Sequence, residues 1–195
     1  MPSRAESAAA TRRALLDAAA GLLDRGGLEA VTLRAVGAQA GVSRGAPYRH
    51  FPDKESLLIA VGTRAWDRLG DQLQALRANP GLSAAEKLRG GIITLIGISR
   101  SQPHLHKLMF SNPPGDPTAL ARAAERSQTE FLAIVADLVG ERDARRYGAL
   151  LISTANGIAG MEVSGQLPDE KWGEVSAEEL IDTLVGMIAG EGQRA

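Results

Sequence analysis

The stretch Thr32–Leu58, TLRAVGAQAGVSRGAPYRHFPDKESLL, decides the fold of the N-terminal part of the chain. Apolar residues three and four positions apart predict a short helix that Thr32 caps and Gly41 ends. A second short helix is expected from Ser43, as its N-cap, to about His50. Two short helices joined by a tight glycine turn are typical of the helix-turn-helix, whose second helix enters the major groove of DNA.

Pro47 stands inside the second of these expected helices. With Ser43 as N-cap, Pro47 is the fourth helical residue, and its ring nitrogen cannot donate to the Ser43 carbonyl. A proline in a helix interior costs about 3 kcal/mol, but here only one hydrogen bond near the helix start is lost. We therefore expect a short or slightly distorted second helix.

The rest of the chain is also expected to be helical. Gly26-Gly27 ends the first helix, Asp53 caps a long one, and Ser83 and Ser176 cap two others. The expected helices cover residues 11–24, 33–40, 43–50, 54–78, 84–100, 103–110, 117–139, 143–163 and 177–189. With about nine helices and no convincing strand, the sequence predicts an all-α fold. We expect a helix-turn-helix domain over 1–55 and a helical bundle over 56–195.

The composition is that of an ordinary globular protein. The chain has 195 residues, 44% of them hydrophobic and 23% charged, which excludes a disordered or collagen-like chain. The absence of cysteine excludes disulfides, thiolate zinc sites and cysteine catalysis. No apolar stretch reaches the roughly 20 residues of a membrane span, and the N-terminus is unlike a signal peptide. We therefore expect a cytoplasmic protein with no membrane partner.

The net charge of −1 is unevenly distributed. Residues 1–55 contain eight basic and six acidic side chains, and residues 56–195 contain 14 basic and 17 acidic ones. This composition argues against an indiscriminate polycationic binder. Affinity for DNA would instead come from a few well-placed cations and helix N-termini.

Several motifs within the opening stretch carry a family resemblance. Ala40-Gly41-Val42-Ser43, the pattern Tyr48-x-His50-Phe51 and Lys54-Glu55 resemble the N-terminal DNA-binding domain of TetR/AcrR-type transcriptional regulators. The resemblance implies a homodimer, most often a repressor, that binds a palindromic double-stranded DNA operator and responds to a small molecule. An inducer bound in the bundle would shift the helix over 54–78 and change the separation of the two recognition helices.

The same resemblance implies a set of DNA contacts. Arg44 is expected to read a base, because its guanidinium can bond guanine O6 and N7. Small residues at Gly45 and Ala46 would let the helix approach, with the Ala46 methyl available to a thymine methyl. The predicted DNA-binding residues are Thr32, Ser43, Arg44, Gly45, Ala46, Tyr48, Arg49, His50 and Lys54. Arg12, Arg13 and Arg34 are either solvated or near phosphates, and Phe51 is expected in the core.

The family pattern also implies two sites in the C-terminal bundle. The predicted effector pocket comprises Trp66, Leu69, Leu73, Ile93, Ile96, Met109, Phe110, Phe131, Val135 and Asn156. Its few aromatic residues and lack of charge favour a mainly apolar effector, and Asn156 needs a hydrogen-bond partner if it is buried. The predicted dimer interface comprises Ile152, Ala155, Ala159, Val163, Leu180, Leu184, Met187 and Ile188. The alternative is that these last residues face the core of their own subunit.

Two other classes of protein were considered. A helical enzyme or metal-binding bundle lacks support, because no nucleophile–base set and no phosphate-binding glycine loop is present. His104 and His106 would diverge by about 200° on a helix and cannot chelate one metal together. We therefore expect no catalytic activity, no metal and no cofactor. A helical interaction protein whose DNA-reading surface has decayed remains an alternative, with Pro47 as the feature that suggests it.

Overall fold

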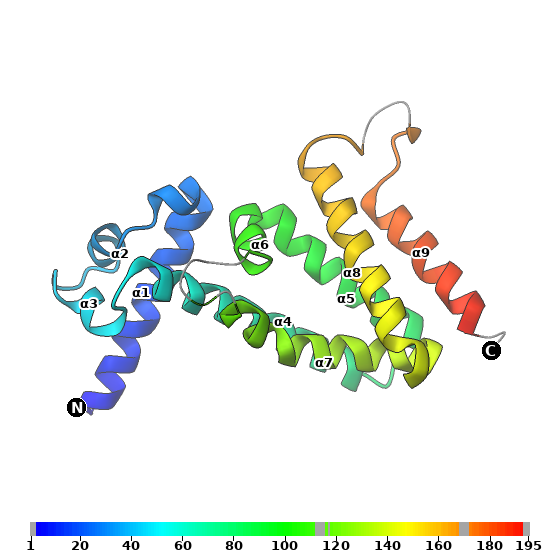
Figure 1. Cartoon of the computed structure of the whole chain (residues 1–195), viewed down its shortest axis with the longest axis horizontal. Coiled ribbons are helices and arrows are strands. Elements are labelled where there is room, and N and C mark those ends of the chain that lie inside the picture. Colours follow the sequence, from blue (N-terminus) through cyan, green and yellow to red (C-terminus); the bar gives the residue numbers. More distant parts are fainter. Residues whose placement is uncertain (1–2, 112–115, 117, 168–171, 193–195) are drawn as a thin grey trace. The chain divides into compact units, whose positions relative to one another are not determined.

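The computed structural model describes residues 3–111, 116, 118–167 and 172–192 (Figure 1). Within these residues the chain forms nine α-helices and no strand, which confirms the all-α prediction. The helices are α1 (Arg4–Ala30), α2 (Leu33–Gln39), α3 (Ala46–His50), α4 (Lys54–Ala78), α5 (Ala84–Ser101), α6 (Pro103–Met109), α7 (Ala119–Val139), α8 (Glu141–Val163) and α9 (Ala177–Gly192). None of the described helices is both long and apolar enough to cross a membrane.

The helices form two compact units. One unit comprises residues 1–65 and 102–123, and the other comprises residues 66–101 and 124–195. α4 and α7 contribute residues to both units. The sequence did not anticipate that α6 belongs with the N-terminal residues. The functional division expected at residues 55 and 56 stays a prediction.

Capping side chains set several helix ends where the sequence predicts them. The Thr32 hydroxyl oxygen accepts from the Ala35 amide at 3.1 Å, and Asp53 accepts from the Ser56 amide at 2.7 Å. Ser83 and Ser176 each form a reciprocal pair with the glutamate three residues later. These bonds satisfy amide groups that have no partner within their helix.

In the N-terminal unit, α1 contacts α2, α3 and α6. α1 begins earlier than expected, but its backbone leaves helical geometry at Gly26 and Gly27, where the sequence predicts a stop. Gly27 has φ +62°, and a Cβ there would lie 3.2 Å from the His104 ring on α6. A glycine at this position therefore permits both the left-handed backbone and the close approach of α6. The buried core includes Leu15, Leu23, Val31, Val36, Phe51 and Leu57.

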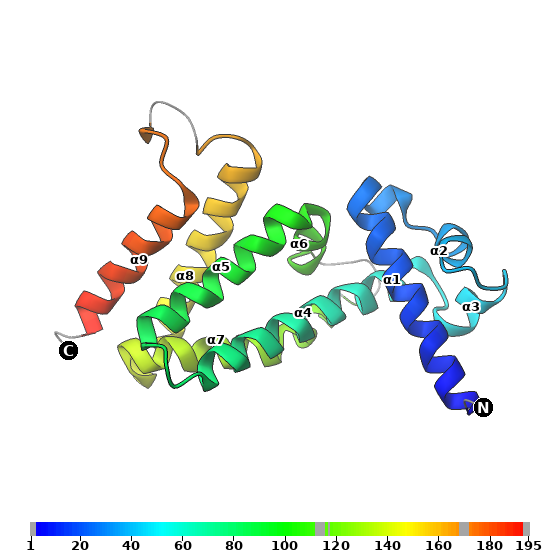
Figure 2. The same ribbon diagram turned by 180° about the vertical axis from the view of Figure 1, so that it is seen from behind.

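In the C-terminal unit, α5 packs against both α8 and α9 (Figure 2). The fully buried side chains of this unit include Leu88, Ile92, Ile134, Leu151 and Ile181. The Arg100 guanidinium on α5 bonds Glu162 of α8 and Glu178 of α9 at 2.6–2.9 Å. One cation thus connects the three helices at the surface of the unit.

Candidate nucleic-acid interface

The helix-turn-helix is built by α2, a glycine turn and α3. Gly41 has φ +67°, a conformation that glycine adopts without strain. The Val42 amide donates to the Gly37 carbonyl at 3.1 Å, and the Ala46 amide donates to the Ser43 carbonyl at 2.9 Å. These two bonds close the turn between the helices and fix where α3 begins.

The start of α3 corrects the sequence prediction. α3 begins at Ala46 with Gly45 as N-cap, and Ser43 lies in the turn before it. Pro47 therefore falls in the first turn of the helix, where its missing N–H needs no partner within the helix. The Ser43 carbonyl, which was expected to lose a bond, accepts one from Ala46. The expected loss of a hydrogen bond is wrong for this reason.

Pro47 also has a close packing partner. It is buried, and a Cβ built on Gly37 of α2 would lie only 2.7 Å from its Cγ atom. The absence of a side chain at Gly37 thus makes room for the proline ring. This contact fixes how closely α2 and α3 cross.

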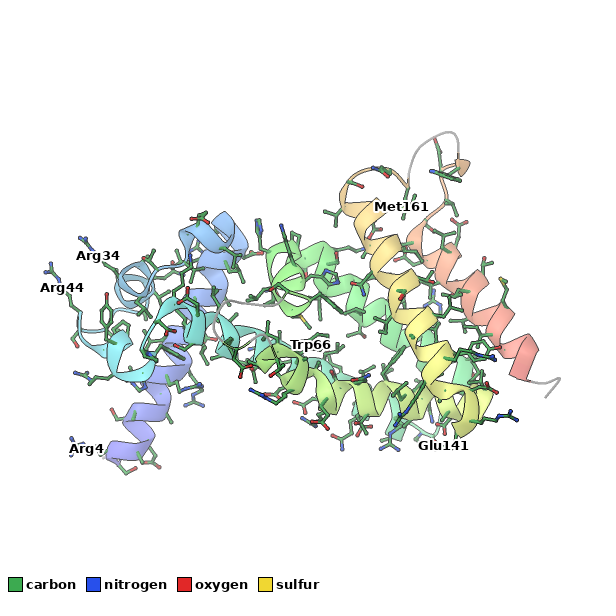
Figure 3. The ribbon with its side chains drawn as sticks, in the orientation of Figure 1. Arg4, Arg34, Arg44, Trp66, Glu141 and Met161 are labelled. Carbon is green, nitrogen blue, oxygen red and sulfur yellow. The ribbon has the colours of Figure 1, made fainter. Side chains whose placement is uncertain are left out.

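Most of the predicted DNA-binding residues are accessible. Arg44 is exposed, as are Ser43, Gly45 and Arg49, and Tyr48 is 58% exposed. Arg34 and Arg44 extend from α2 and the turn toward the solvent (Figure 3). Among the described residues, no carboxylate forms an ion pair with either guanidinium. Both cations are therefore available to an external anion or base.

Two predicted contacts are placed differently by the structure. Ala46 is only 3% exposed and packs inside the unit, so its methyl is not presented to a thymine. Lys54 donates from Nζ to the Leu28 carbonyl at 2.7 Å, where α1 ends. The lysine thus already has a structural partner, and its remaining two N–H groups could reach a phosphate.

Phe51 and Arg12 form the inner side of this region. Phe51 is 2% exposed, which confirms its prediction as a core residue. The Arg12 guanidinium lies over the Phe51 ring, 5.2 Å from its centroid. This is a cation–π contact, which holds Arg12 against the base of α3.

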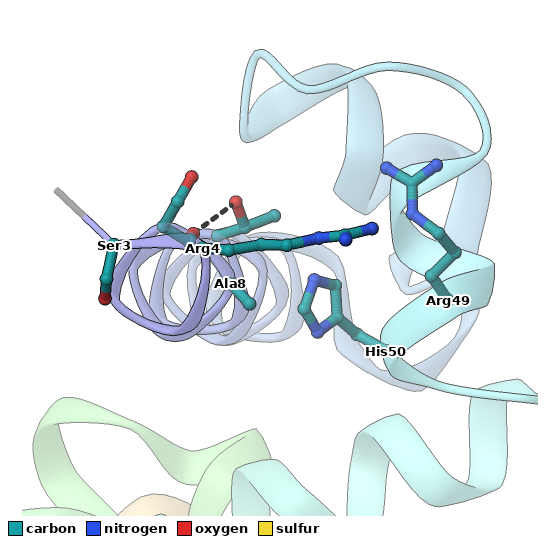
Figure 4. A pocket seen from close by; sticks show the side chains of 7 residues that line it. Ser3, Arg4, Ala8, Arg49 and His50 are labelled. Atoms are coloured by element: carbon teal, nitrogen blue, oxygen red, sulfur yellow. Dashed lines mark hydrogen bonds between the residues drawn. The ribbon is translucent and has the colours of Figure 1, made fainter. Parts of the chain in front are cut away.

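A hollow of about 500 Å³ lies where the first turns of α1 meet the end of α3 (Figure 4). It is lined by Ser3, Arg4, Ser7, Ala8, Thr11, Arg49 and His50. Arg4 is not among the predicted DNA-binding residues. The apolar periodicity begins only at Thr11, so the residues before it were assigned to no helix. The capping pair of Ser3 and Glu6 was the signal that could have extended the helix.

The predicted pocket residues are mostly core residues. Trp66, Leu69, Leu73, Ile96, Phe131 and Val135 are buried in the C-terminal unit, and Ile93 is half-buried there. Met109 and Phe110 belong to the other unit, and Phe110 is exposed. Asn156 donates from Nδ2 to the Ile152 carbonyl at 2.9 Å, so its own helix supplies a partner.

The predicted dimer residues fall into two groups. Ala155, Ala159 and Ile188 are at most 3% exposed and pack inside their own subunit. Val163 and Met187 are exposed, while Ile152, Leu180 and Leu184 are half-buried. The alternative of a core role is thus the better description of the first group.

Among the described residues no group of three or more histidine, aspartate or glutamate side chains lies close enough to hold a metal.

Comparisons with known proteins agree with this architecture. Residues 15–61 match the model of "Bacterial regulatory proteins, tetR family", and residues 88–185 match that of "Tetracyclin repressor-like, C-terminal domain". Over 58 residues the chain is 43% identical to the HTH-type transcriptional repressor KstR of Rhodococcus jostii. This match covers 30% of the chain and 27% of KstR.

Two solved structures share the fold over nearly the whole chain. A protein of unknown function from Rhodococcus sp. RHA1 is 26% identical, with a TM-score of 0.74 and 94% of each chain covered. A transcriptional regulator from Rhodococcus sp. Rha1 is 23% identical, with a TM-score of 0.74, and covers 92% of this chain and 96% of its own.

Proposed function

The chain belongs to the tetR family of bacterial regulatory proteins, and on that premise we propose that it is a ligand-responsive, homodimeric transcriptional repressor that binds a palindromic DNA operator. The observation that carries the proposal is the exposed Arg44, which lies in the turn before α3 with no carboxylate paired to it among the described residues. Such a guanidinium is suited to guanine O6 and N7 in a major groove. KstR, a repressor, supports repression as the direction of control.

The proposed phosphate contacts come from other residues of the helix-turn-helix. The exposed Tyr48 and Arg49 and the half-buried His50 lie on α3, and Thr32 is the N-cap of α2. Phosphate contacts position a protein on the duplex, and base contacts select the sequence. We assign Arg44 to selection and its neighbours to positioning. A regulator of this kind works in the cytoplasm, and we assign it no catalytic role.

The reason for considering an interaction protein with a decayed DNA-reading surface no longer holds. It depended on Pro47 disturbing the recognition helix, yet Pro47 lies in the first turn of α3 and packs on Gly37. No hydrogen bond of the Ser43 carbonyl is lost. An intact α3 beside an unpaired arginine favours a functional DNA-binding surface.

Dimerisation is proposed on the outward faces of α8 and α9. A Cβ at Gly157, Gly160, Gly186 or Gly190 would meet nothing within 4 Å in the single chain. Glycine in a helix interior costs about 1 kcal/mol relative to alanine, and packing within the subunit does not require it here. Close approach of a second copy would explain these glycines, with Val163 and Met187 as apolar contacts beside them.

The effector is proposed to be a small, mainly apolar molecule bound in the C-terminal unit. Its candidate contacts are the buried apolar side chains of α4, α5 and α7, with Asn156 as the polar one. A coupling free energy of about 1–3 kcal/mol between effector and DNA suffices to change operator occupancy several-fold or more. α4 is the candidate route, because it contributes residues to both units.

The test is a gel-shift titration of the purified protein with a labelled DNA fragment from upstream of its own gene, against unrelated DNA of equal length. We expect tighter binding to the upstream fragment, weakened by salt. Arg44→Ala should lower the preference between the two DNAs by roughly 10-fold, the worth of a bidentate base contact of about 1–3 kcal/mol. Binding that is neither selective nor salt-sensitive would refute the proposal, as would unchanged selectivity in Arg44→Ala.

A further inference from the structure

The hollow between the start of α1 and the end of α3 concentrates positive charge. Arg4 extends from α1 toward His50 and Arg49 of α3 (Figure 4), and all three side chains line the hollow. The lining contains no aspartate or glutamate. Two guanidinium groups and an imidazole thus face the same volume of solvent.

Other groups do not neutralise this charge. Within the described part of the chain, neither Arg4 nor Arg49 forms an ion pair with a carboxylate. Glu6, the acidic residue nearest Arg4 in sequence, accepts from the Ser3 amide at 2.6 Å, which lowers its pKa. Its carboxylate therefore serves the N-cap of α1. Like charges that converge without a counter-charge raise the free energy of the unbound protein, and an anion placed among them would lower it.

The position of the hollow indicates which anion fits. Arg49 and His50 occupy the last turn of α3, at the other end of that helix from Arg44. When the N-terminal end of α3 contacts base edges in a major groove, its C-terminal end lies toward the border of the groove, where the phosphates are. Ser7 adds a hydroxyl group to the lining, which suits a group with several acceptor oxygens, while the Thr11 hydroxyl already donates to the Ser7 carbonyl at 2.9 Å.

We propose that this hollow holds one backbone phosphate of the bound DNA, contacted by Arg4, Arg49 and His50. The inference rests on the proposed function, because it needs DNA as the ligand. Arg4 thereby becomes a positioning residue that joins the first turn of α1 to the DNA-binding surface. Since phosphate carries no sequence information, Arg4 increases affinity for every DNA and contributes nothing to the choice of operator.

The test compares three versions of the 195-residue chain: wild type, Arg4→Gln and the control Arg145→Gln. Arg145 is an exposed arginine on α8, so the control removes the same charge outside the proposed surface. Fluorescence anisotropy would follow binding to the upstream fragment and to unrelated DNA over a range of salt concentrations. We expect Arg4→Gln to lower the affinity for both DNAs by roughly 10-fold per subunit, as for the loss of a hydrogen bond to a charged group. The slope of log K against log salt should fall by about 0.9 per subunit.

A second measurement locates the contact. Once footprinting has defined the operator, single phosphates are replaced by neutral methylphosphonates. At one phosphate in each half-site, the neutral replacement should weaken DNA binding by wild type and by Arg145→Gln. The same replacement should leave DNA binding by Arg4→Gln unchanged. Arg49→Gln, a second variant of the hollow, should be insensitive at the same phosphate.

The outcomes separate this inference from the proposed function. If wild type binds neither DNA in a salt-dependent manner, the proposed function fails, and the inference fails with it. If wild type binds normally while Arg4→Gln retains its affinity, slope and methylphosphonate profile, the hollow is not a phosphate site and the function stands. If Arg145→Gln lowers the slope of log K against log salt as much as Arg4→Gln does, Arg4 acts only through the overall charge of the protein, and the inference is wrong.

Discussion

At the residue scale, the contact between Gly37 and Pro47 sets the geometry of the helix-turn-helix. The 2.7 Å between a Cβ at position 37 and the proline Cγ leaves no room for a methyl group. We expect Gly37→Ala to lower the free energy of unfolding by about 1–3 kcal/mol, the usual cost of overpacking. Urea denaturation of both proteins measures the difference.

Two further variants make that result specific. Gly97→Ala on α5, where a Cβ meets nothing within 4 Å, should gain up to about 1 kcal/mol from helix propensity. The double variant Gly37→Ala/Pro47→Ala should be more stable than the two single changes added together, because the ring that obstructs the methyl is gone. Strict additivity would contradict the proposed contact.

His106 on α6 predicts a pH dependence of stability. Burial lowers its pKa from the usual 6.5, and among the described residues its Nε2 atom has no hydrogen-bond partner. The unfolded chain therefore takes up this proton at a higher pH than the folded one. This contribution to the free energy of unfolding is complete above pH 6.5 and decreases as the pH falls toward the lowered pKa.

The measurement is the free energy of unfolding between pH 7.5 and 5, for wild type and His106→Phe. The variant should lose less stability than wild type as the pH falls, because the buried titrating group is gone. His104→Asn, an exposed histidine change on the same helix, is the control. Parallel curves for wild type and His106→Phe would show that burial of His106 does not resist protonation.

At the element scale, Arg100 connects α5 to α8 and α9 through Glu162 and Glu178. Its guanidinium lowers the pKa of Glu178 to about 2. The stabilisation of this ion pair is therefore present above the ordinary glutamate pKa of 4.5 and decreases as the pH falls toward about 2. Since all three side chains are partly exposed, we expect Arg100→Gln to cost about 1 kcal/mol at pH 7.

Thermal unfolding of wild type and Arg100→Gln from pH 7 to pH 2 tests this ion pair. The difference between the two should shrink as Glu178 becomes protonated. Arg145→Gln, which removes an exposed charge from α8, should show a smaller difference at every pH. A difference that persists undiminished at pH 2 would mean that Arg100 stabilises by packing rather than by charge.

The start of α3 shows how far residue preferences predict an element. Serine is a common N-cap, and that preference alone favoured Ser43. Proline is also favoured in the first turn of a helix, so Pro47 itself indicated the later start at Ala46 that the structure has. Most other helices were predicted well because a capping side chain or a glycine break marks their ends, as Thr32 and Gly27 do.

Which face of a helix is buried was harder to predict. Ala155 and Ala159 suggested a surface for close helix contact, but both pack inside their own subunit. Small residues lie on more than one face of α8, since Gly157 and Gly160 leave open space around them. Side-chain size alone cannot distinguish these faces; the partner helices α5 and α9 decide between them. Arg4 was missed for a related reason, because its role depends on α3, far away in sequence.

At the scale of the whole molecule, the proposed dimer predicts opposite effects of one substitution on folding and on assembly. Gly157→Leu adds bulk where the single chain has open space and replaces a poor helix former. We expect the subunit to gain up to about 1 kcal/mol in stability, while sedimentation shows a shift from dimer to monomer. A palindromic operator needs two recognition helices about 34–36 Å apart, so the variant should also bind the upstream fragment more weakly. Gln128→Leu, at an exposed position on α7, is the control and should stay dimeric. A Gly157→Leu protein that remains dimeric would place the subunit contact away from this face of α8.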